Sequence, residues 1–312
     1  MRNSLNVRGA FKLARFAQER QIEIMHAHVA RDYPVIALAA ARAGGLPFVL
    51  TRHLQFPLSR GHRITLRGVA RVIAVSQVVA DSLYAQRVFD RDKIVVIHHG
   101  IDFEKFSQGI KAGPENNGRR VGTIGQLAPA KGQRDFVRAA AIVADRIGDV
   151  EFIIAGEDKS RTGENRHRLA ELIRQLGLGD RVSLLGRCDD LPQLLATFDL
   201  FVSPSRLESF GLAIVEAMAC GVPVIATGTG GAGEIIHEGE TGRLVPIGDA
   251  KALANGICDL LGNPAERERL SANARRDVAD RFSLAKMVDA TERIYLDVLA
   301  ARRSAGRAAL LR

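Results

Sequence analysis

Two glutamates, Glu208 and Glu216, are the side chains of this sequence whose placement points to chemistry. The segment from Gly211 to Cys220 is apolar on nearly every side, and a glycine and a proline follow it, so it predicts a buried helix that ends before a strand. Glu216 lies inside that helix, where an unpaired carboxylate would cost several kcal/mol. We therefore expect Glu216 to hold a polar partner.

The turn before this helix could bind an anion. Backbone amides at a helix start have no partner within the helix, and a glycine in the turn lets a ligand approach closely. A phosphate fits such a place, and a vicinal diol such as a ribose could donate two hydrogen bonds to Glu216, with Glu208 facing what lies beyond the phosphates. The turn consists of Ser209, Phe210, Gly211 and Leu212. Together these features point to a nucleotide sugar.

A lysine could complete this anion site. Lys131 closes the stretch GQLAPAK, which starts at Gly125 between a predicted strand and a predicted helix. From there its ammonium group could reach an anion across a cleft. The stretch is not a Walker phosphate loop, because a glycine and not a serine or threonine follows the lysine. A solvated lysine at a helix start is the plain alternative.

The surroundings of the two glutamates resemble a known signature. From Ser205 to Ile225 the sequence reads SRLESFGLAIVEAMACGVPVI, which closely resembles the signature of family 4 retaining glycosyltransferases, enzymes with the GT-B fold. The resemblance implies that Glu216 binds ribose and that Glu208 holds hydroxyls of the donor sugar. It also implies that Lys131 and the helix-start amides stabilise the leaving diphosphate. A salt bridge to a buried arginine is the alternative for Glu216.

Gln126 departs from the family pattern. The family usually has an arginine at this position, which shares the diphosphate with the lysine. In this sequence Arg206, Arg134 or Arg52 could supply the second positive charge, and the sequence does not choose among them.

Histidines follow two predicted strands of the first half. Thr51 and His53 resemble the family's Thr-x-His motif, in which the histidine approaches the reacting sugar, and a neutral imidazole can bind a hydroxyl without burying a charge. His26 and His28 end the preceding strand in the order His-Ala-His, and simple packing is an equal alternative for them. His99 stands where the family usually has asparagine. No acidic ligand lies near these histidines, and the family generally needs no metal, so we expect neither a metal nor another cofactor.

The segment from Gly228 to Gly233 has the glycine spacing of a dinucleotide-binding loop. It lies late in the chain, and no strand ending in an acid follows at the expected distance, so a dehydrogenase is a distant alternative. The resemblance implies instead that this loop packs beside the donor sugar and phosphates. We expect Gly230 and Gly231 to contribute to that contact.

The composition indicates a globular protein that meets an anionic partner. The chain has 312 residues, of which 46% are hydrophobic, and a net charge of +9, whereas its 5% of aromatic residues do not interleave with the basic runs and so argue against nucleic acid. No apolar run approaches the roughly eighteen residues of a membrane span and no signal core opens the sequence, so we expect a cytoplasmic protein. In the family that the sequence resembles, the loop after Thr51 faces the acceptor, so its basic residues imply an anionic or membrane-anchored acceptor and hence a peripheral membrane contact. A solvated basic surface is an equal alternative. The basic residues are Arg52, Arg60, His62, Arg63, Arg67 and Arg71.

Strand-length apolar runs alternate with helical patterns almost throughout, which predicts parallel α/β architecture. With the resemblance, this predicts two Rossmann-like domains facing a cleft. Family members usually begin with a further strand and a glycine-rich loop, so we expect the amino-terminal domain to be truncated. The predicted parts are an acceptor-side domain over residues 1–107, a linker over 108–118, a donor domain over 119–284, and a helix with a basic tail over 285–312.

The sequence thus predicts a retaining, hexosyltransferase-type glycosyltransferase. It would move a sugar from a nucleoside diphosphate to a saccharide or lipid-linked saccharide, of the cell-envelope polysaccharide or lipopolysaccharide type. Two alternatives stay open: a nucleotide-sugar epimerase with the same fold, and a catalytically silent fragment that binds nucleotide sugar.

Overall fold

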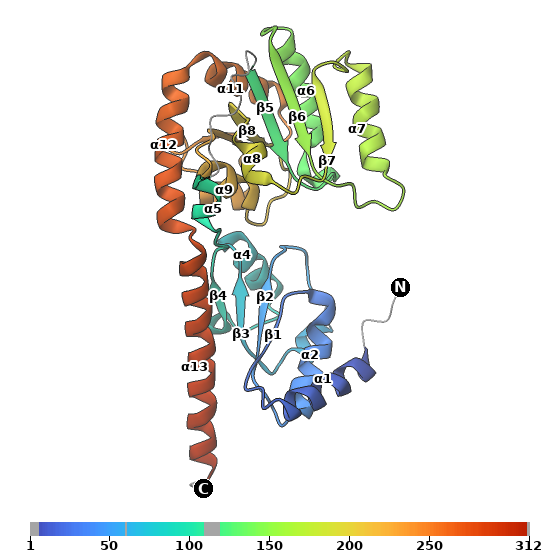
Figure 1. The fold of residues 1–312 in the computed structure, drawn as a ribbon. Coiled ribbons are helices and arrows are strands. Elements are labelled where there is room, and N and C mark those ends of the chain that lie inside the picture. Colours follow the sequence, from blue (N-terminus) through green and yellow to red (C-terminus); the bar gives the residue numbers. More distant parts are fainter. Residues whose placement is uncertain (1–5, 60, 109–118, 311–312) are drawn as a thin grey trace. The chain divides into compact units, whose positions relative to one another are not determined.

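The computed structural model describes residues 6–59, 61–108 and 119–310, with side chains up to residue 304 except that of residue 108. Within these residues the chain forms two compact units (Figure 1). The first unit combines residues up to His99 with those from Ala285 onward, and the second spans Gly100–Leu284. The linker predicted over 108–118 lies outside the described residues, apart from its first position. The segment from Ala285, predicted as a separate helix and tail, belongs to the first unit.

The first unit is built on a parallel sheet with the strand order β1-β2-β3-β4. Because parallel strands end at the same edge, the residues that follow β1, β2 and β4 lie near one another. The strands are β1 (Met25–Ala27), β2 (Phe48–Arg52), β3 (Val69–Ala74) and β4 (Ile94–Val96). The helices are α1 (Val7–Glu19), α2 (Tyr33–Arg42), α3 (His62–Thr65), α4 (Gln77–Gln86) and α13 (Leu284–Leu310), with short 3-10 turns at Ala30–Asp32 and Arg91–Lys93.

Helix α13 packs on the sheet of the first unit although it comes from the far end of the chain. Val298 of α13 forms a buried cluster with Val49 of β2 and Ile73 of β3, and Ile294 and Tyr295 pack against that cluster. The apolar face of α13 therefore has the sheet as its partner. This contact explains why the segment from Ala285 belongs to the first unit.

The second unit contains a parallel sheet with the order β10-β9-β8-β5-β6-β7. The order reverses at β5, so the loops after β5 and β8 meet at the carboxyl edge, where open α/β sheets bind ligands. The strands are β5 (Arg119–Ile124), β6 (Val150–Ala155), β7 (Val182–Gly186), β8 (Leu200–Ser203), β9 (Val224–Thr227) and β10 (Arg243–Val245). The helices are α5 (Phe103–Gln108), α6 (Gln133–Ala144), α7 (Glu164–Gln175), α8 (Leu191–Leu195), α9 (Leu212–Ala219), α10 (Gly230–Ile235), α11 (Ala250–Gly262) and α12 (Pro264–Arg281), with a 3-10 turn at Pro129–Lys131.

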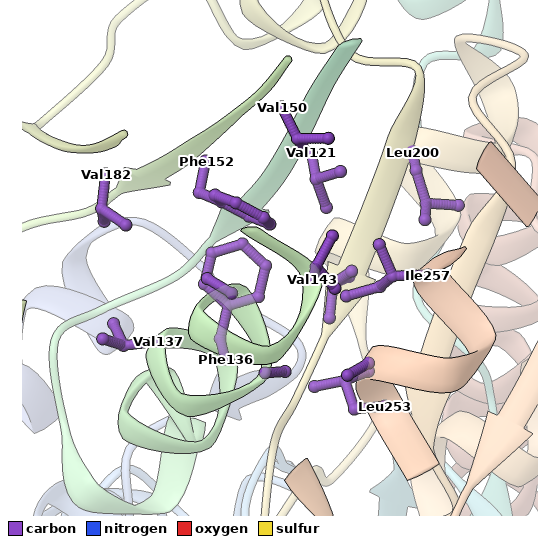
Figure 2. Packing of buried hydrophobic residues seen from close by; sticks show 14 of the residues in the cluster. Val121, Phe136, Val137, Val143, Val150, Phe152, Val182, Leu200, Leu253 and Ile257 are labelled. Atoms are coloured by element: carbon purple, nitrogen blue, oxygen red, sulfur yellow. The ribbon is translucent and has the colours of Figure 1, made fainter. Parts of the chain in front are cut away.

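The core of the second unit lies between this sheet and helices α6 and α11 (Figure 2). Phe136 of α6 meets Phe152 of β6 edge to face, with ring centroids 5.9 Å apart, and Ile257 of α11 packs into the same cluster. Both phenylalanines are fully buried, which stabilises the unit by roughly 2–3 kcal/mol for each. The parallel α/β architecture predicted from the sequence is confirmed in both units.

Candidate functional site

Two loops at the carboxyl edge of the second unit bring Lys131 and Glu208 together. Lys131 follows β5 and Glu208 follows β8, and the Nζ atom of Lys131 lies 2.7 Å from the Oε2 atom of Glu208. The Oγ atom of Ser205 donates a second hydrogen bond to the same oxygen, at 3.1 Å. The Glu208 side chain is only 14% exposed, so this is a partly shielded ion pair and not a solvated surface contact.

The backbones of the same two loops are joined. The carbonyl of Ala130 accepts hydrogen bonds from the amide of Arg206 at 2.8 Å and from the amide of Leu207 at 3.2 Å. Gly132 has a φ of +68°, and a Cβ atom there would lie 1.8 Å from the carbonyl oxygen of Pro204. Only glycine allows this approach, because any other side chain would clash with the facing backbone. Lys131 and Glu208 are therefore held in register by their loops.

A further ion pair supports this junction. Arg206 donates through Nε and Nη2 to both carboxylate oxygens of Asp135, at 2.8 and 2.9 Å, and the Asp135 side chain is 4% exposed. This hydrogen-bonded carboxylate raises the pKa of the Arg206 guanidinium. Sequence reasoning missed Asp135. The only feature of the sequence that could point to Asp135 is its place in the first turn of a predicted helix, and acidic residues are common at exposed helix starts.

Two of the three arginines that could replace the arginine expected at Gln126 already have partners of their own in the structure. Arg206 is held by Asp135, and Arg52 lies in the first unit, where it donates to the carbonyl of Phe56. Arg134 is exposed and lines a small cavity beside α7. Gln126 itself has an exposed side chain, and its carbonyl accepts a hydrogen bond from the Gln133 side chain at 2.9 Å.

Glu216 lies on α9 as predicted, and the helix surrounds it with apolar residues. Its side chain is half-buried, and burial raises the pKa of its carboxyl group, an effect that Lys105 of α5 opposes. Among the described residues no arginine forms an ion pair with Glu216. The structure therefore gives no support to the alternative of a buried salt bridge. Burial together with Glu216 also raises the pKa of the nearby Cys220 thiol to about 12.

The turn into α9 and the glycine loop contact each other. The amide of Gly231 donates to the carbonyl of Glu208 at 3.2 Å, and a Cβ atom on Gly231 would lie 2.6 Å from the carbonyl oxygen of Phe210. Gly211, at φ +119°, caps the start of α9, while Gly230 opens α10. The Phe210 ring is buried against Phe282. The side chain therefore belongs to the core, whereas the backbone of Phe210 forms part of the turn. Ser209 is half-buried and Leu212 is exposed.

In the first unit, three histidines line up along the carboxyl edge of the sheet. Nδ1 of His28 lies 3.2 Å from Nε2 of His53, and Nδ1 of His53 lies 3.3 Å from Nε2 of His99. The rings of His53 and His99 are stacked with their centroids 5.2 Å apart. Burial, followed by the charges of His28 and Arg52, lowers the pKa of His53. The lowered pKa favours the neutral form of the His53 imidazole at neutral pH; its binding of a sugar hydroxyl stays a prediction.

His26 joins this row and connects it to α13. Its Nδ1 lies 2.5 Å from the hydroxyl of Tyr295, and its Nε2 lies 2.8 Å from the hydroxyl of Thr51. Burial, then the neighbouring histidines, lowers the pKa of both His26 and His99 to about 4. The histidines form one wall of a cavity of about 610 Å³, and α13 contributes Met287 and Tyr295 to its lining. No pattern in the sequence indicates this contact of Tyr295 with His26.

Two other features are absent from the described residues, a metal-binding cluster and a membrane-spanning helix. In the part of the chain that the structure describes, no group of three or more His, Cys, Asp or Glu side chains is arranged to hold a metal ion. Of the helices in the same residues, none combines the length and apolar character needed to cross a membrane.

Two family descriptions match the chain. Residues 105–277 match Glycosyl transferases group 1, and residues 1–105 match Glycosyltransferase Family 4. The prediction that the amino-terminal domain is truncated is not supported by these matches. The predicted resemblance to family 4 glycosyltransferases of the GT-B fold is confirmed.

Individual relatives agree with these matches. The chain is 30% identical to N-acetyl-alpha-D-glucosaminyl L-malate synthase of Bacillus anthracis, over 93% of this chain and 78% of that protein. It is 31% identical to D-inositol 3-phosphate glycosyltransferase of Mycolicibacterium smegmatis, over 84% of this chain but only 59% of that protein. The solved structure of HepE from Anabaena, in complex with UDP and glucose, has a TM-score of 0.82 at 27% identity, over 91% of this chain and 80% of that one. The chain therefore belongs to the glycosyl transferases group 1 family and is a GT-B glycosyltransferase.

Proposed function

We propose that this protein transfers a sugar from a nucleoside diphosphate to a saccharide or lipid-linked saccharide, with retention at the anomeric carbon. The observation that carries the proposal is the arrangement at the start of α9. There, the Lys131–Glu208 pair meets the turn into the helix, and the half-buried Glu216 lies further along the same helix. This arrangement offers a cation and backbone amides to a diphosphate and carboxylates to sugar hydroxyls.

Each group has a distinct role in the proposed donor complex. Glu216 accepts hydrogen bonds from the ribose hydroxyls, a role favoured by its half-buried position without an arginine partner among the described residues. Lys131 and the amides of Phe210 to Leu212 stabilise the negative charge that grows on the leaving diphosphate. Glu208, which holds Lys131 in the present structure, turns toward the hydroxyls of the donor sugar.

Retention follows in this proposal from displacement on a single face of the sugar. The bond between the anomeric carbon and the diphosphate oxygen breaks, and the acceptor hydroxyl oxygen bonds to the same face of that carbon. The acceptor proton passes to the departing phosphate oxygen, so no enzyme carboxylate needs to form a covalent intermediate. His53 acts as a neutral hydrogen-bonding partner for a sugar hydroxyl, which its lowered pKa supports.

The relatives support the donor class more than the acceptor. The similar Anabaena structure contains UDP and glucose, whereas the names of the two enzyme relatives contain two different compounds, L-malate and D-inositol 3-phosphate. We propose a saccharide or lipid-linked acceptor of the envelope-polysaccharide or lipopolysaccharide type. A lipid-linked acceptor would place the reaction at the cytoplasmic face of a membrane, with peripheral contact. The proposed reaction uses no metal and no other cofactor.

Titration calorimetry tests the donor site directly. UDP, GDP and ADP are titrated into the wild type, Glu216→Ala and a control, Glu268→Ala, which removes an exposed glutamate of the same unit. We expect Glu216→Ala to weaken the preferred nucleotide by about tenfold or more, because two charge-assisted hydrogen bonds are lost. Equal affinity of both variants for every nucleotide would contradict the proposal. Isomerisation of the donor without acceptor would favour the epimerase instead.

A further inference from the structure

A second cavity in the first unit lies at the opposite edge of the sheet from the histidines. The histidine row follows the carboxyl ends of the strands, whereas this cavity is bordered by Val69, the first residue of β3, and by Lys93, which precedes β4. Its volume is about 230 Å³. The two sites therefore lie at different ends of the same strands.

Positive charge dominates the lining of this cavity. Four cationic side chains border it, against the single carboxylate of Asp90. Lys93 lies 3.4 Å from Asp90, so that carboxylate is already matched. Among the described residues the three arginines form no ion pair, although most arginines of the second unit do. The cationic residues are Arg63, Arg67, Arg87 and Lys93.

The structure separates residues that the sequence grouped together. The basic residues after Thr51 were expected to face one acceptor, but Arg52 is buried and donates to the carbonyl of Phe56. Arg63 and Arg67, on α3 and just after it, instead line the cavity at the amino edge. Arg60 lies outside the described residues. The charge at the amino edge is therefore not explained by the site proposed above.

Arg87 adds an independent observation. It ends α4 with a φ of +51° and a ψ of +35°, in the left-handed region where glycine is the cheapest residue. A side chain with a Cβ atom is strained in that conformation, whereas glycine is not. Arg87 thus places a cationic side chain on the border of the cavity, at a position where glycine would fit the backbone conformation better.

We propose that this cavity binds the phosphate group of a phosphate ester. Guanidinium groups bind phosphate oxygens in pairs through their planar donors, and three of them surround a space large enough for one phosphate and a small remainder. Leu66, Val69 and Phe89 provide an apolar wall for the organic part of the ester. The ester is either a soluble sugar phosphate or a lipid headgroup, and exposed Ile64 next to Arg63 would enter the lipid in the second case.

The test uses the full chain with Lys131→Ala, which weakens phosphate binding at the proposed donor site, and any binding that remains there is common to all the variants compared below. Two probes are compared at about 0.15 M salt, where weak surface attraction is screened. Inorganic pyrophosphate is titrated by calorimetry, and vesicles of phosphatidylcholine with or without phosphatidic acid are used in a flotation assay. Binding of pyrophosphate assigns a soluble ester, and binding only to the phosphatidic acid vesicles assigns a lipid headgroup.

Three variants identify the site. Arg63→Gln with Arg67→Gln should weaken binding by about tenfold or more, because two guanidinium contacts are lost. Arg87→Gly should weaken it without loss of stability, since glycine suits the left-handed turn. Arg8→Gln with Lys12→Gln removes the same charge from the exposed side of α1 and should leave binding unchanged. Failure of both probes to bind, or equal weakening by the α1 control, would overturn the proposal.

Discussion

The ammonium group of Lys131 lies 2.7 Å from the carboxylate of Glu208, across two loops that are 77 residues apart in the sequence. In the present structure Glu208 thus neutralises the cation that we propose for the donor diphosphate. The diphosphate and the carboxylate would compete for one ammonium group, because both are anions that need the same donor. Binding of the donor should therefore release Glu208 for the sugar hydroxyls.

This competition predicts opposite effects of two substitutions on nucleotide binding. Glu208→Gln should bind the nucleoside diphosphate at least as tightly as the wild type, because the competing charge is gone, while transfer falls by about a hundredfold or more for lack of the carboxylate. Lys131→Met should weaken the same nucleotide by about tenfold, or ~1.4 kcal/mol. Calorimetry gives the affinities and a product assay gives the rates. Weaker nucleotide binding by Glu208→Gln would contradict the competition.

Gly132 is predicted to be indispensable for the position of Lys131. Gly132→Ala would put a Cβ atom 1.8 Å from the Pro204 carbonyl, so the two loops must separate. Gly177→Ala is a matched control, because Gly177 has nearly the same φ, +66°, but nothing within 4 Å of the added atom. We expect about 1 kcal/mol of destabilisation for the control and clearly more, about 3 kcal/mol, at Gly132. Urea unfolding followed by circular dichroism compares them. Equal losses would mean that the loops are not held together as described.

The ion pair with the buried Asp135 predicts that Arg206 contributes to the stability of the second unit. Arg206→Ala removes the bidentate partner of a carboxylate that is 4% exposed, and among the described residues the one other ion-pair partner of Asp135 is Arg138, at 3.4 Å. We expect a loss of about 2 kcal/mol, which comes from the buried carboxylate and not from the half-exposed guanidinium. The control Arg187→Ala breaks an exposed pair with Asp189 and should not change stability measurably. Hydrogen exchange in the second unit measures both. A loss in Arg206→Ala no larger than in the control would show that Asp135 does not depend on Arg206.

The sequence was sufficient to predict the two parallel α/β halves, the place of Glu216 on α9 and that of Glu208 in the loop before this helix, because local patterns carry that information. Strand-length apolar runs show the sheets, and a carboxylate in an apolar helix is visible without any partner. The meeting of Lys131 and Glu208 was also foreseeable in outline, since both follow strands of one sheet. Their direct ion pair was not predicted.

Contacts between distant segments could not be predicted in this way. The bond between His26 and Tyr295 joins residues 269 positions apart, and no periodicity in either segment indicates the other. The Asp135–Arg206 pair was missed for the same reason, because each residue alone resembles an ordinary surface charge. The placement of Arg63 and Arg67 was obscured by their closeness in sequence to Thr51, since the chain crosses from one edge of the sheet to the other between these residues.

The row of histidines predicts that the first unit loses stability in mild acid. His26 and His99 have pKa values of about 4 in the folded protein, against 6.5 for an unperturbed histidine. Between these values the unfolded chain binds more protons than the folded one, so the free energy of unfolding falls as the pH drops from about 6.5 to about 4. Each pKa unit corresponds to about 1.4 kcal/mol, and partial exposure of both rings reduces the expected loss to on the order of 1–2 kcal/mol for each histidine.

Tyrosine fluorescence can isolate this effect, because the chain has no tryptophan and its three tyrosines, Tyr33, Tyr84 and Tyr295, all belong to the first unit. Urea unfolding at pH 7.5 and 5 should give a smaller difference for His99→Asn than for the wild type, since one titrating ring with a lowered pKa is removed. His167→Asn, which replaces an exposed histidine of the second unit, should keep the wild-type difference. If His99→Asn keeps it as well, burial of the His99 ring does not make folding depend on pH, and that ring is not held neutral as we infer.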